Sequence, residues 1–569
     1  MKCGYILVYG FLANFFAPVL TTQTQPIENS INISSDVPTV EVKNGTLIGS
    51  YLPNFDQDVF LGIPYAQPPI GDLRFMNPQS LNSTFPTKGL EVTEYSDVCM
   101  NDGAFGDSSG LPSSEDCLTL NIIKPSRNPD YPLPVVLWIH GGGFSDGSSR
   151  RDVYNLSYIV ENGVEMGKPF IGVSLNYRLG GFGFLKSDEV LKSGNTNVGL
   201  RDQLKAIEWL HENIESFGGD PNHIVIWGES AGAYSVGLLL LSGKIGTYIK
   251  GAIMESGSGR MSGVHSDVDS EADEVAFRNI TKFFNCTDKN ALSCLKKIEA
   301  SSLNEVFSGK TKVLDTAINP YPFVDGDFIS YFSSVKMNHP FFIPEIPIII
   351  GTNTAEGTSF APKGLNTSNQ AKTYLLETYP LLRNSSIKKL CELYTGNFTL
   401  DLYGSENVTI PSSFGSQFTR LASIIGDFKF IAQSRAFARS WASRHIKVYK
   451  YRWNVADNDV EQAIGATHFQ EVVYVFDNPS KKFVTAAPWN KDKSSPDLAK
   501  LISKQWISFI TTLDPNNHGI QNIPEWKVFS KSQERNFVFE LNNKSHMEED
   551  GFRKEAINYV IGLGTQIGV

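Results

Sequence analysis

A serine between two glycines is the first candidate for chemistry. Residues 228–232 have the sequence GESAG, a G-x-S-x-G pattern that directly follows the apolar run 223–227 and precedes a small-residue helix start. In this context the pattern forms a sharp turn that exposes the serine hydroxyl, and side chains flanking the turn must be small to avoid collision. The sequence therefore predicts that Ser230 is a nucleophile. The alternative is a glycine-rich turn with an incidental serine.

A glycine run upstream of this serine is the second candidate. Residues 140–144 have the sequence HGGGF and follow the apolar run 133–139. Consecutive glycines let bare backbone N–H groups approach a developing oxyanion. A phosphate site would instead need G-K-[ST], or G-x-G-x-x-G with an acidic partner, and neither pattern is present. We expect His140 to be structural, because it precedes Ser230 in a class of hydrolases ordered serine, acid, histidine.

The chain order serine, acid, histidine also limits which residues can be the acid and the base. His468 lies in the small-residue loop 465–469, which permits close approach to a serine. Glu356 follows the apolar run 346–350, at the place where a histidine-orienting carboxylate belongs, although a solvated loop carboxylate is the alternative. The other histidines after Ser230 are less suitable as the base. His265 and His339 precede Glu356 in the chain, and His445 is expected at a helix end. His518 and His546 lie in polar surroundings and are expected to be solvated.

These candidates need a scaffold of alternating strands and helices. Such alternation predicts an α/β fold with a large, mostly parallel central sheet and helices on both faces. Asn44-Gly45 within residues 40–51 also predicts a hairpin. We expect one α/β domain over residues 38–569, with insertions at 258–344 and 362–445. Expected strands are 133–139, 170–175, 223–227, 346–350 and 448–453, and expected helices are 200–217, 496–513 and 551–563.

Composition limits the classes of partner. The chain has 569 residues, of which 41 % are hydrophobic and 19 % charged, as in soluble globular proteins. Lys and Arg number 50 against 60 Asp and Glu, which gives a net charge of −10 without a basic stripe, so we expect no nucleic-acid partner. No Cys/His cluster has metal-ligand spacing, and a serine nucleophile with a histidine base needs neither a metal nor an organic cofactor. The oligomeric state is not predicted.

The N-terminal segment has the features of an export signal. Lys2 precedes the apolar run 4–16, which is shorter than the roughly 20 residues that span a bilayer. We expect a signal peptide at 1–21, a polar segment at 22–37, no transmembrane segment, and a secreted, extracellular protein. Candidate N-glycosylation sites are Asn32, Asn44, Asn82, Asn155, Asn279, Asn285, Asn366, Asn384, Asn397, Asn407 and Asn543.

The cysteines agree with export. Cys3 would leave with the signal peptide, so at least one remaining cysteine is unpaired or intermolecular. Two pairs lie close in sequence, Cys99 with Cys117 and Cys286 with Cys294. Cys391 lies among apolar residues at helical spacing and is expected to be a buried, inert thiol.

Sequence blocks along nearly the whole chain resemble one family. The serine pattern is part of a longer signature, and a second signature surrounds Cys117. The chain is therefore similar to the type-B carboxylesterase/lipase family, the cholinesterase-like branch of the α/β-hydrolases, and most of all to fungal secreted lipases and esterases. The matching blocks are residues 60–66, 115–121, 176–178, 197–203 and 217–232.

The resemblance implies an α/β-hydrolase fold and a set of site residues. By that similarity Ser230 is the nucleophile, Glu356 the acid and His468 the base. It further implies that Ser256 is a buried serine supporting the acid, and that the oxyanion-hole donors are Gly142, Gly143 and Ala231. The implied disulfides are Cys99–Cys117 and Cys286–Cys294, and the implied buried ion pairs are Arg74–Glu115 and Arg178–Asp202.

The loop inside the first implied disulfide departs from two branches of the family. Cholinesterases carry a choline-binding tryptophan there, whereas residues 100–116 have Phe105 as their only aromatic residue, which leaves a cation–π site unsupported. Family lipases carry a long amphipathic lid there. In this chain the loop is short, rich in glycine and acidic, and it defines no continuous apolar face. We expect an open gorge.

The resulting prediction is a secreted serine hydrolase that acts through an acyl-enzyme on short- to medium-chain carboxylic esters. Its partner is a small-molecule or lipid ester. Three alternatives remain. A triacylglycerol lipase or sterol esterase of the same family differs in substrate, and a serine carboxypeptidase shares the serine turn but not the other blocks. A non-catalytic cholinesterase-like adhesion or binding protein would usually lack part of the triad and carry a membrane stalk.

Overall fold

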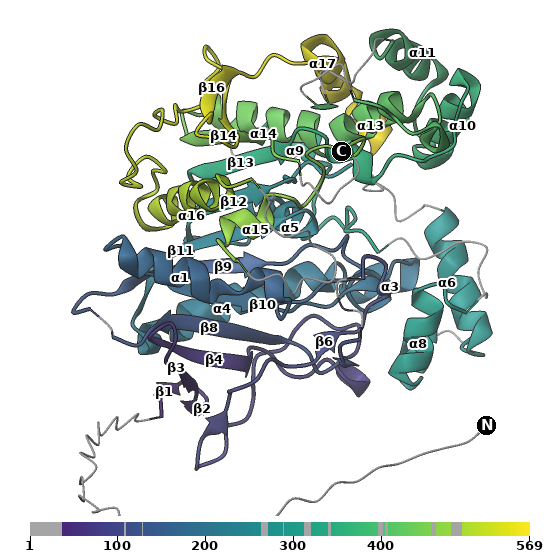
Figure 1. Cartoon of the computed structure of the whole chain (residues 1–569). Helices are drawn as coiled ribbons and strands as arrows, with labels where there is room; N and C mark the ends of the chain where they lie inside the picture. The colour runs from purple at the N-terminus through teal and green to yellow at the C-terminus, as the bar shows by residue number, and fades with distance from the viewer. Residues whose placement is uncertain are drawn as a thin grey trace, which may run out of the picture. The chain divides into compact units, whose positions relative to one another are not determined.

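An eleven-stranded mixed sheet organises the chain from residue 37 to residue 569 (Figure 1). This computed structural model describes those residues except 107, 109, 128, 263–270, 288–289, 312–319, 340–342, 396–401, 404–407, 457–461 and 480–491. The expected signal peptide, the polar segment before residue 37, Cys3 and His265 lie outside the described residues.

Seven neighbouring strands at the centre of the sheet are parallel. From β10 through β9, β11, β12, β13 and β14 to β15 every pairing is parallel, whereas β8, β4, β3 and β16 add antiparallel edges. This agrees with the expected mostly parallel sheet. In spatial order the strands are β16 (His546–Glu549), β15 (Arg535–Phe539), β14 (Val448–Trp453), β13 (Ile348–Asn353), β12 (Ile249–Glu255), β11 (Gly219–Glu229), β9 (Leu133–Ile139), β10 (Ile171–Leu175), β8 (Thr119–Pro125), β4 (Gln57–Pro64) and β3 (Ser50–Leu52).

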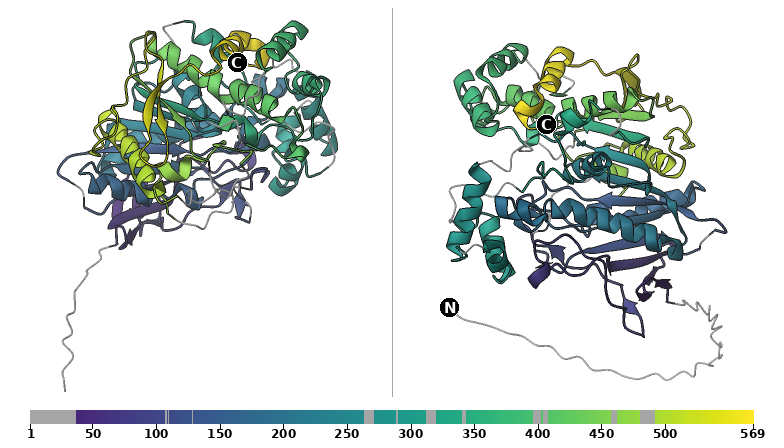
Figure 2. Two further views of the ribbon diagram at one scale, coloured as in Figure 1. Left: turned by 45° about the horizontal axis from the view of Figure 1, so that its top comes forward. Right: turned by 180° about the vertical axis from the view of Figure 1, so that it is seen from behind.

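Helices cover both faces of the sheet, because its strands are apolar on both sides. Along β9, Val135 and Leu137 belong to one core, while Val136 and Trp138 belong to the core on the opposite face. The first core contains α4 (Val198–Asn213), α5 (Ala231–Ser242), α14 (Ala432–Ala442) and α17 (Lys554–Leu563). The second contains α1 (Leu156–Glu165), α15 (Val472–Val475) and α16 (Ser495–Thr512). Figure 1 labels these helices, and Figure 2 shows the same ribbon in two further views.

Two helical insertions interrupt the strand order. The first lies between β12 and β13 and contains α6 (Glu271–Phe283), α7 (Ala291–Leu295), α8 (Ala300–Phe307) and α9 (Ser333–Lys336). The second lies between β13 and β14 and contains α10 (Ser368–Thr378), α11 (Asn384–Leu393), α13 (Phe418–Gly426), a π-helical turn at Asp427–Ile431, and α14. In Figure 1, α6 and α8 lie on the same side of the sheet as α10 and α11.

Small local differences separate the structure from the sequence predictions. In the N-terminal hairpin the turn residues are Lys43 and Asn44, so Gly45 begins the second strand at a φ of 123° instead of completing the turn. The helix expected over 200–217 begins at Val198 and changes to a 3₁₀ turn at Ile214. Cys391 is a free thiol as expected, but it is only partly buried, because it packs on the rim of the core.

Covalent and ionic links fix the surroundings of the sheet. The disulfides Cys99–Cys117 and Cys286–Cys294 are both present. Arg74 pairs with Glu115 at 2.6 Å, and both residues are largely buried. Arg178 Nη2 lies 2.6 Å from Asp202 Oδ1, and its Nε donates to the other carboxylate oxygen at 2.8 Å. Burial raises the pKa of Asp202 while Arg178 opposes the rise, so the carboxylate depends on the guanidinium.

Arg178→Met should lower the free energy of unfolding by about 3–5 kcal/mol, because it leaves Asp202 uncompensated in the interior. Arg439→Met is the matched control, since Arg439 pairs with Glu534 at 2.7 Å with both side chains more than a fifth exposed, and it should cost at most about 1 kcal/mol. Urea unfolding followed by tryptophan fluorescence measures both changes. Equal losses in the two variants would contradict the assignment.

Candidate active site

Three parallel strands deliver the expected catalytic side chains to one edge of the sheet. Ser230 follows β11, Glu356 begins the 3₁₀ turn Glu356–Ser359 after β13, and His468 lies in the loop beyond β14. The carboxyl ends of parallel strands meet at the same edge, which is where α/β proteins place their ligands. Residues more than a hundred positions apart in sequence are thereby brought within hydrogen-bonding distance.

The three side chains form a continuous hydrogen-bonded chain. Ser230 Oγ lies 2.8 Å from His468 Nε2, and His468 Nδ1 lies 2.7 Å from Glu356 Oε2. Glu356 is fully buried and also accepts from the backbone N–H of Asn353 at 2.8 Å, whereas the His468 side chain keeps 11 % exposure. The arrangement can remove the hydroxyl proton and hold the resulting imidazolium beside a carboxylate.

Ser230 occupies a strained backbone conformation at the start of α5. Its φ of 54° and ψ of −120° are unfavourable for a residue with a side chain. The turn is possible because its flanks lack side chains: a Cβ at Gly232 would lie 1.9 Å from the carbonyl oxygen of Ile139, and one at Gly228 would lie 2.5 Å from the Gly232 backbone. Close contact between β9 and the turn therefore holds the hydroxyl outward.

The glycine loop after β9 faces the same cavity. Gly142 and Gly143 have φ values of 95° and 61°, and the Gly142 carbonyl accepts from the N–H groups of Ser145 and Asp146. Together with Ala231, the first residue of α5, they line the cavity. None of the described residues accepts a hydrogen bond from these three N–H groups, so they are available to an oxyanion.

His140, at the base of this loop, has the features of a structural residue. It is buried, stacks on Tyr177 at 4.5 Å between ring centroids, and lies with Nδ1 2.9 Å from the Gly141 carbonyl. Burial lowers its pKa to about 4, so it is neutral near pH 7.

His518 does not follow the expectation of a solvated side chain: it is 7 % exposed, because the polar turn around it folds inward.

Glu471 is a second buried carboxylate, for which the sequence analysis assigned no role. It accepts from Asn353 Nδ2 at 2.6 Å and from Ser256 Oγ at 3.1 Å. The hydroxyl of Ser256 therefore contacts Glu471, and it supports the expected acid Glu356 only through Asn353, which bonds both carboxylates. Burial and the nearby Glu356 raise the pKa of Glu471 to about 7, against the opposing effect of the Asn353 amide.

Two further glutamates end the adjacent strands. Glu229 is buried, with Oε1 3.3 Å from His468 Nε2. Glu255, paired with it in register, accepts from the indole N–H groups of Trp227 at 2.6 Å and Trp506 at 2.7 Å. Burial, with a smaller effect of Glu471, raises the pKa of Glu255 well above its ordinary value, against the opposing effect of the two indole donors. In the sequence, Glu229 directly precedes Ser230 and Glu255 directly precedes Ser256. These positions next to two expected site serines are the sequence feature that could have identified the glutamates.

Aromatic side chains enclose a cavity of about 180 Å³ above Ser230. Phe430 and Phe360 contact the His468 ring, with centroids 4.6 Å and 5.1 Å away. The volume lies below the roughly 300–1,000 Å³ of pockets that hold drug-sized ligands. The aromatic lining residues are Phe105, Phe144, Tyr234, Tyr321, Phe360, Phe430 and Phe469, and besides the His468 imidazole the lining includes the charged side chains Arg151, Glu229 and Lys429.

Comparison with known proteins finds similarity over nearly the whole chain. A model of the carboxylesterase family matches residues 36–560. Lipase 4 of Diutina rugosa is 31 % identical, with 91 % of this chain and 94 % of that protein covered. Secreted lipase 1 of Botryotinia fuckeliana is 29 % identical, with 99 % of each covered. The crystal structure of Aspergillus niger EstA has a TM-score of 0.80 at 26 % identity, covering 94 % of this chain and 99 % of that one. The expected α/β-hydrolase fold is thereby confirmed.

The pH profile of kcat/KM for a dissolved ester should contain a component with its midpoint near 7, because ionised Glu471 favours a protonated imidazole in the transition state. Glu471→Gln should remove that component and lower the plateau by about tenfold. Ser256→Ala should move it to higher pH, since the carboxylate loses a donor. Profiles of identical shape in the parent and both variants would rule out this role of Glu471.

Proposed function

The chain belongs to the carboxylesterase family and is a carboxylic ester hydrolase, and we propose that it is a secreted serine enzyme that cleaves small, dissolved esters through an acyl-enzyme intermediate. The observation that carries the proposal is the hydrogen-bonded chain Ser230–His468–Glu356 at the floor of an aromatic cavity. The three backbone N–H groups beside it, which donate to none of the described residues, support the same chemistry.

The proposed first step is acylation. Ser230 Oγ attacks the ester carbonyl carbon while His468 Nε2 takes its proton, and Glu356 stabilises the imidazolium through Nδ1. The N–H groups of Gly142, Gly143 and Ala231 would bind the oxyanion of the tetrahedral intermediate. When the carbon–oxygen bond to the alcohol breaks, the imidazolium protonates the leaving alkoxide and an acyl-serine remains.

Deacylation repeats these roles with water. His468 removes a proton from a water molecule that attacks the acyl-serine carbonyl, and then returns a proton to Ser230 as the carboxylic acid leaves. Phe430 and Phe360, packed on the imidazole, limit its rotation between the two half-reactions. The strained turn at Ser230 supports this proposal, because it keeps the oxygen in place for both attacks.

The loop closed by the Cys99–Cys117 disulfide favours small substrates. The backbone N–H of Asp102 donates to Ser145, that of Phe105 donates to Asp146 Oδ2, and Asn304 Nδ2 donates to Asn101 at 2.7 Å. These bonds, added to the Cys99–Cys117 disulfide, tie the loop to the glycine loop and to α8. A loop held in this way opposes the lid opening of a lipase, although several relatives are named lipases.

Secretion is supported by a relative's name and by the chemistry of the chain. Disulfides persist in oxidising compartments, and the described part of the chain contains Cys99–Cys117 and Cys286–Cys294. A relative covered over 99 % of its length is named a secreted lipase. Separately, none of the helices in the described ranges has the length and apolar composition to cross a membrane.

Ser230→Ala should lower kcat by several orders of magnitude, up to about 10⁶-fold, because the nucleophile is lost. A fluorescent phosphonate should label the parent protein and not the variant. Ser242→Ala, the same change at the far end of α5, is the matched control and should keep full labelling and turnover. Retention of activity within about tenfold in Ser230→Ala would exclude Ser230 as the nucleophile.

The rate on tributyrin should follow simple saturation and show no jump when the substrate concentration passes its solubility limit. The reason is that the tied loop leaves the cavity open to dissolved ester without a lid that must open at a lipid surface. Titrated hydrolysis across the solubility limit is the measurement. A sharp increase on emulsion formation would favour the triacylglycerol lipase alternative.

A further inference from the structure

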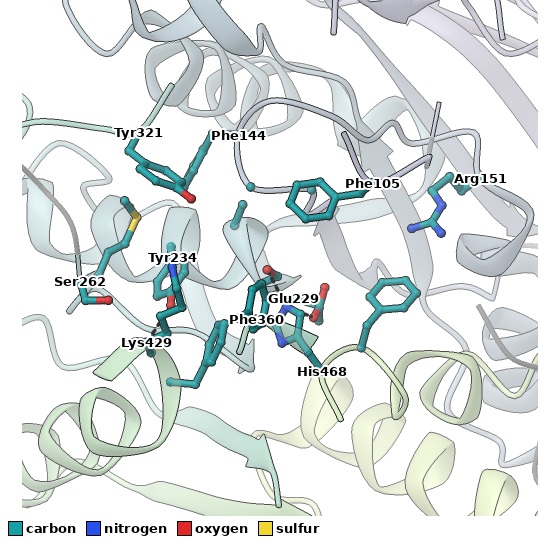
Figure 3. A pocket seen from close by; sticks show the side chains of 17 residues that line it. Phe105, Phe144, Arg151, Glu229, Tyr234, Ser262, Tyr321, Phe360, Lys429 and His468 are labelled. Atoms are coloured by element: carbon teal, nitrogen blue, oxygen red, sulfur yellow. Dashed lines mark hydrogen bonds and ion pairs between the residues drawn. The ribbon is translucent and has the colours of Figure 1, made fainter. Parts of the chain in front are cut away.

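Lys429 projects a positive charge into the cavity from an irregular point in a helix. It belongs to the π-helical turn Asp427–Ile431 between α13 and α14, where the extra residue in the turn changes the direction of the side chains. Its neighbours Phe428 and Phe430 are buried, whereas Lys429 is only partly buried and lines the cavity beside Tyr234 and Phe360 (Figure 3). Such π-helical turns occur frequently at functional sites.

The Lys429 ammonium lacks a charged partner within the described part of the chain. No hydrogen bond or ion pair joins its Nζ to any described residue, and its one ring contact is with Phe360, 5.7 Å from the ring centroid. Burial lowers the pKa of Lys429, but the nearby phenols of Tyr379, Tyr321 and Tyr374 reverse the shift and raise it overall. A lysine whose pKa is raised is a cation near neutral pH.

The other charged residues of the cavity are already engaged. Arg151 lies over the rings of Tyr154 and Phe469 and donates to the Tyr154 hydroxyl at 3.1 Å. Glu229 lies against the His468 imidazole. A partly desolvated cation without a counter-ion is costly unless something else compensates its charge. In a substrate cavity, that compensation can come from the substrate.

From this geometry we propose that Lys429 selects esters that carry a free carboxylate, such as half-esters of dicarboxylic acids. The inference rests on the proposed function and extends it, because it adds a specificity-determining residue to the Ser230 site. The carboxylate would accept hydrogen bonds from Nζ at the aromatic wall while the ester carbonyl lies at Ser230. A neutral ester of equal length would leave the ammonium unpaired.

The test compares matched pairs of esters at pH 7.5, where the carboxylate is ionised. One series places the charge on the acyl arm, as mono-4-nitrophenyl esters of adipic to sebacic acid, each paired with the ester of the corresponding unsubstituted fatty acid. A second places it on the alcohol arm, as butyrate esters of ω-hydroxy acids paired with those of simple alcohols. We expect kcat/KM to favour the anionic member in one series, and Lys429→Met to reduce that preference at least about tenfold.

Two variants complete the design. Lys429→Arg keeps the charge and should retain most of the preference. Lys363→Met is the matched control, because Lys363 also lies over a phenylalanine ring, 3.7 Å from the centroid of Phe414, but does not line the cavity, so the preference should be unchanged. Absence of a preference in both series, or the same preference in Lys429→Met, would overturn the inference. Either result, with phosphonate labelling still dependent on Ser230, leaves the proposed function standing.

Discussion

The backbone turn at Ser230 is the constraint around which the site is built. Its positive-φ conformation is held because β9 passes so close that Gly232 cannot carry a side chain, and because the Ser230 N–H donates to the end of β12 at 2.9 Å. The same close passage of β9 brings the glycine loop beside Ser230. The position of the proposed oxyanion donors and the direction of the serine hydroxyl therefore have one cause, which is the packing of β9 against the turn.

Three buried glutamates, Glu356, Glu229 and Glu471, interact with the His468 imidazole, and a fourth, Glu255, interacts with Glu471. They differ in environment. Glu356 accepts from a backbone N–H and from His468, Glu471 accepts from an amide and a hydroxyl, and Glu255 accepts from two indoles. Burial raises the pKa of Glu255 well above its ordinary value and that of Glu471 to about 7. Both shifts oppose the accumulation of full negative charge beneath the site.

Much of this could be derived from the sequence, because strong local patterns coincided with the family resemblance. The mostly parallel sheet and the convergence of Ser230, Glu356 and His468 follow from apolar runs, glycine turns and the edge rule for parallel strands. The contacts of Ser256 and the charge of the cavity could not be derived. They depend on which side chains meet across β12, β13 and the π-helical turn, and Lys429, between two phenylalanines, has no local signal for its direction. The burial of His518 escapes sequence reasoning for a related reason, since a polar turn can fold inward.

The tied loop within Cys99–Cys117 also changes the energetics of binding. A lid that closes over a ligand loses conformational freedom in each catalytic cycle, and that loss reduces the affinity gained from its contacts. Here the loop loses this freedom once, when the chain folds and its hydrogen bonds to Ser145 and Asp146 form. A ligand with few atoms, which can make only few contacts, then does not have to offset the ordering of a loop in addition to its own loss of translational and rotational freedom. A bulky ligand would have to displace Phe105, whose ring already lies over the backbone of Gly143.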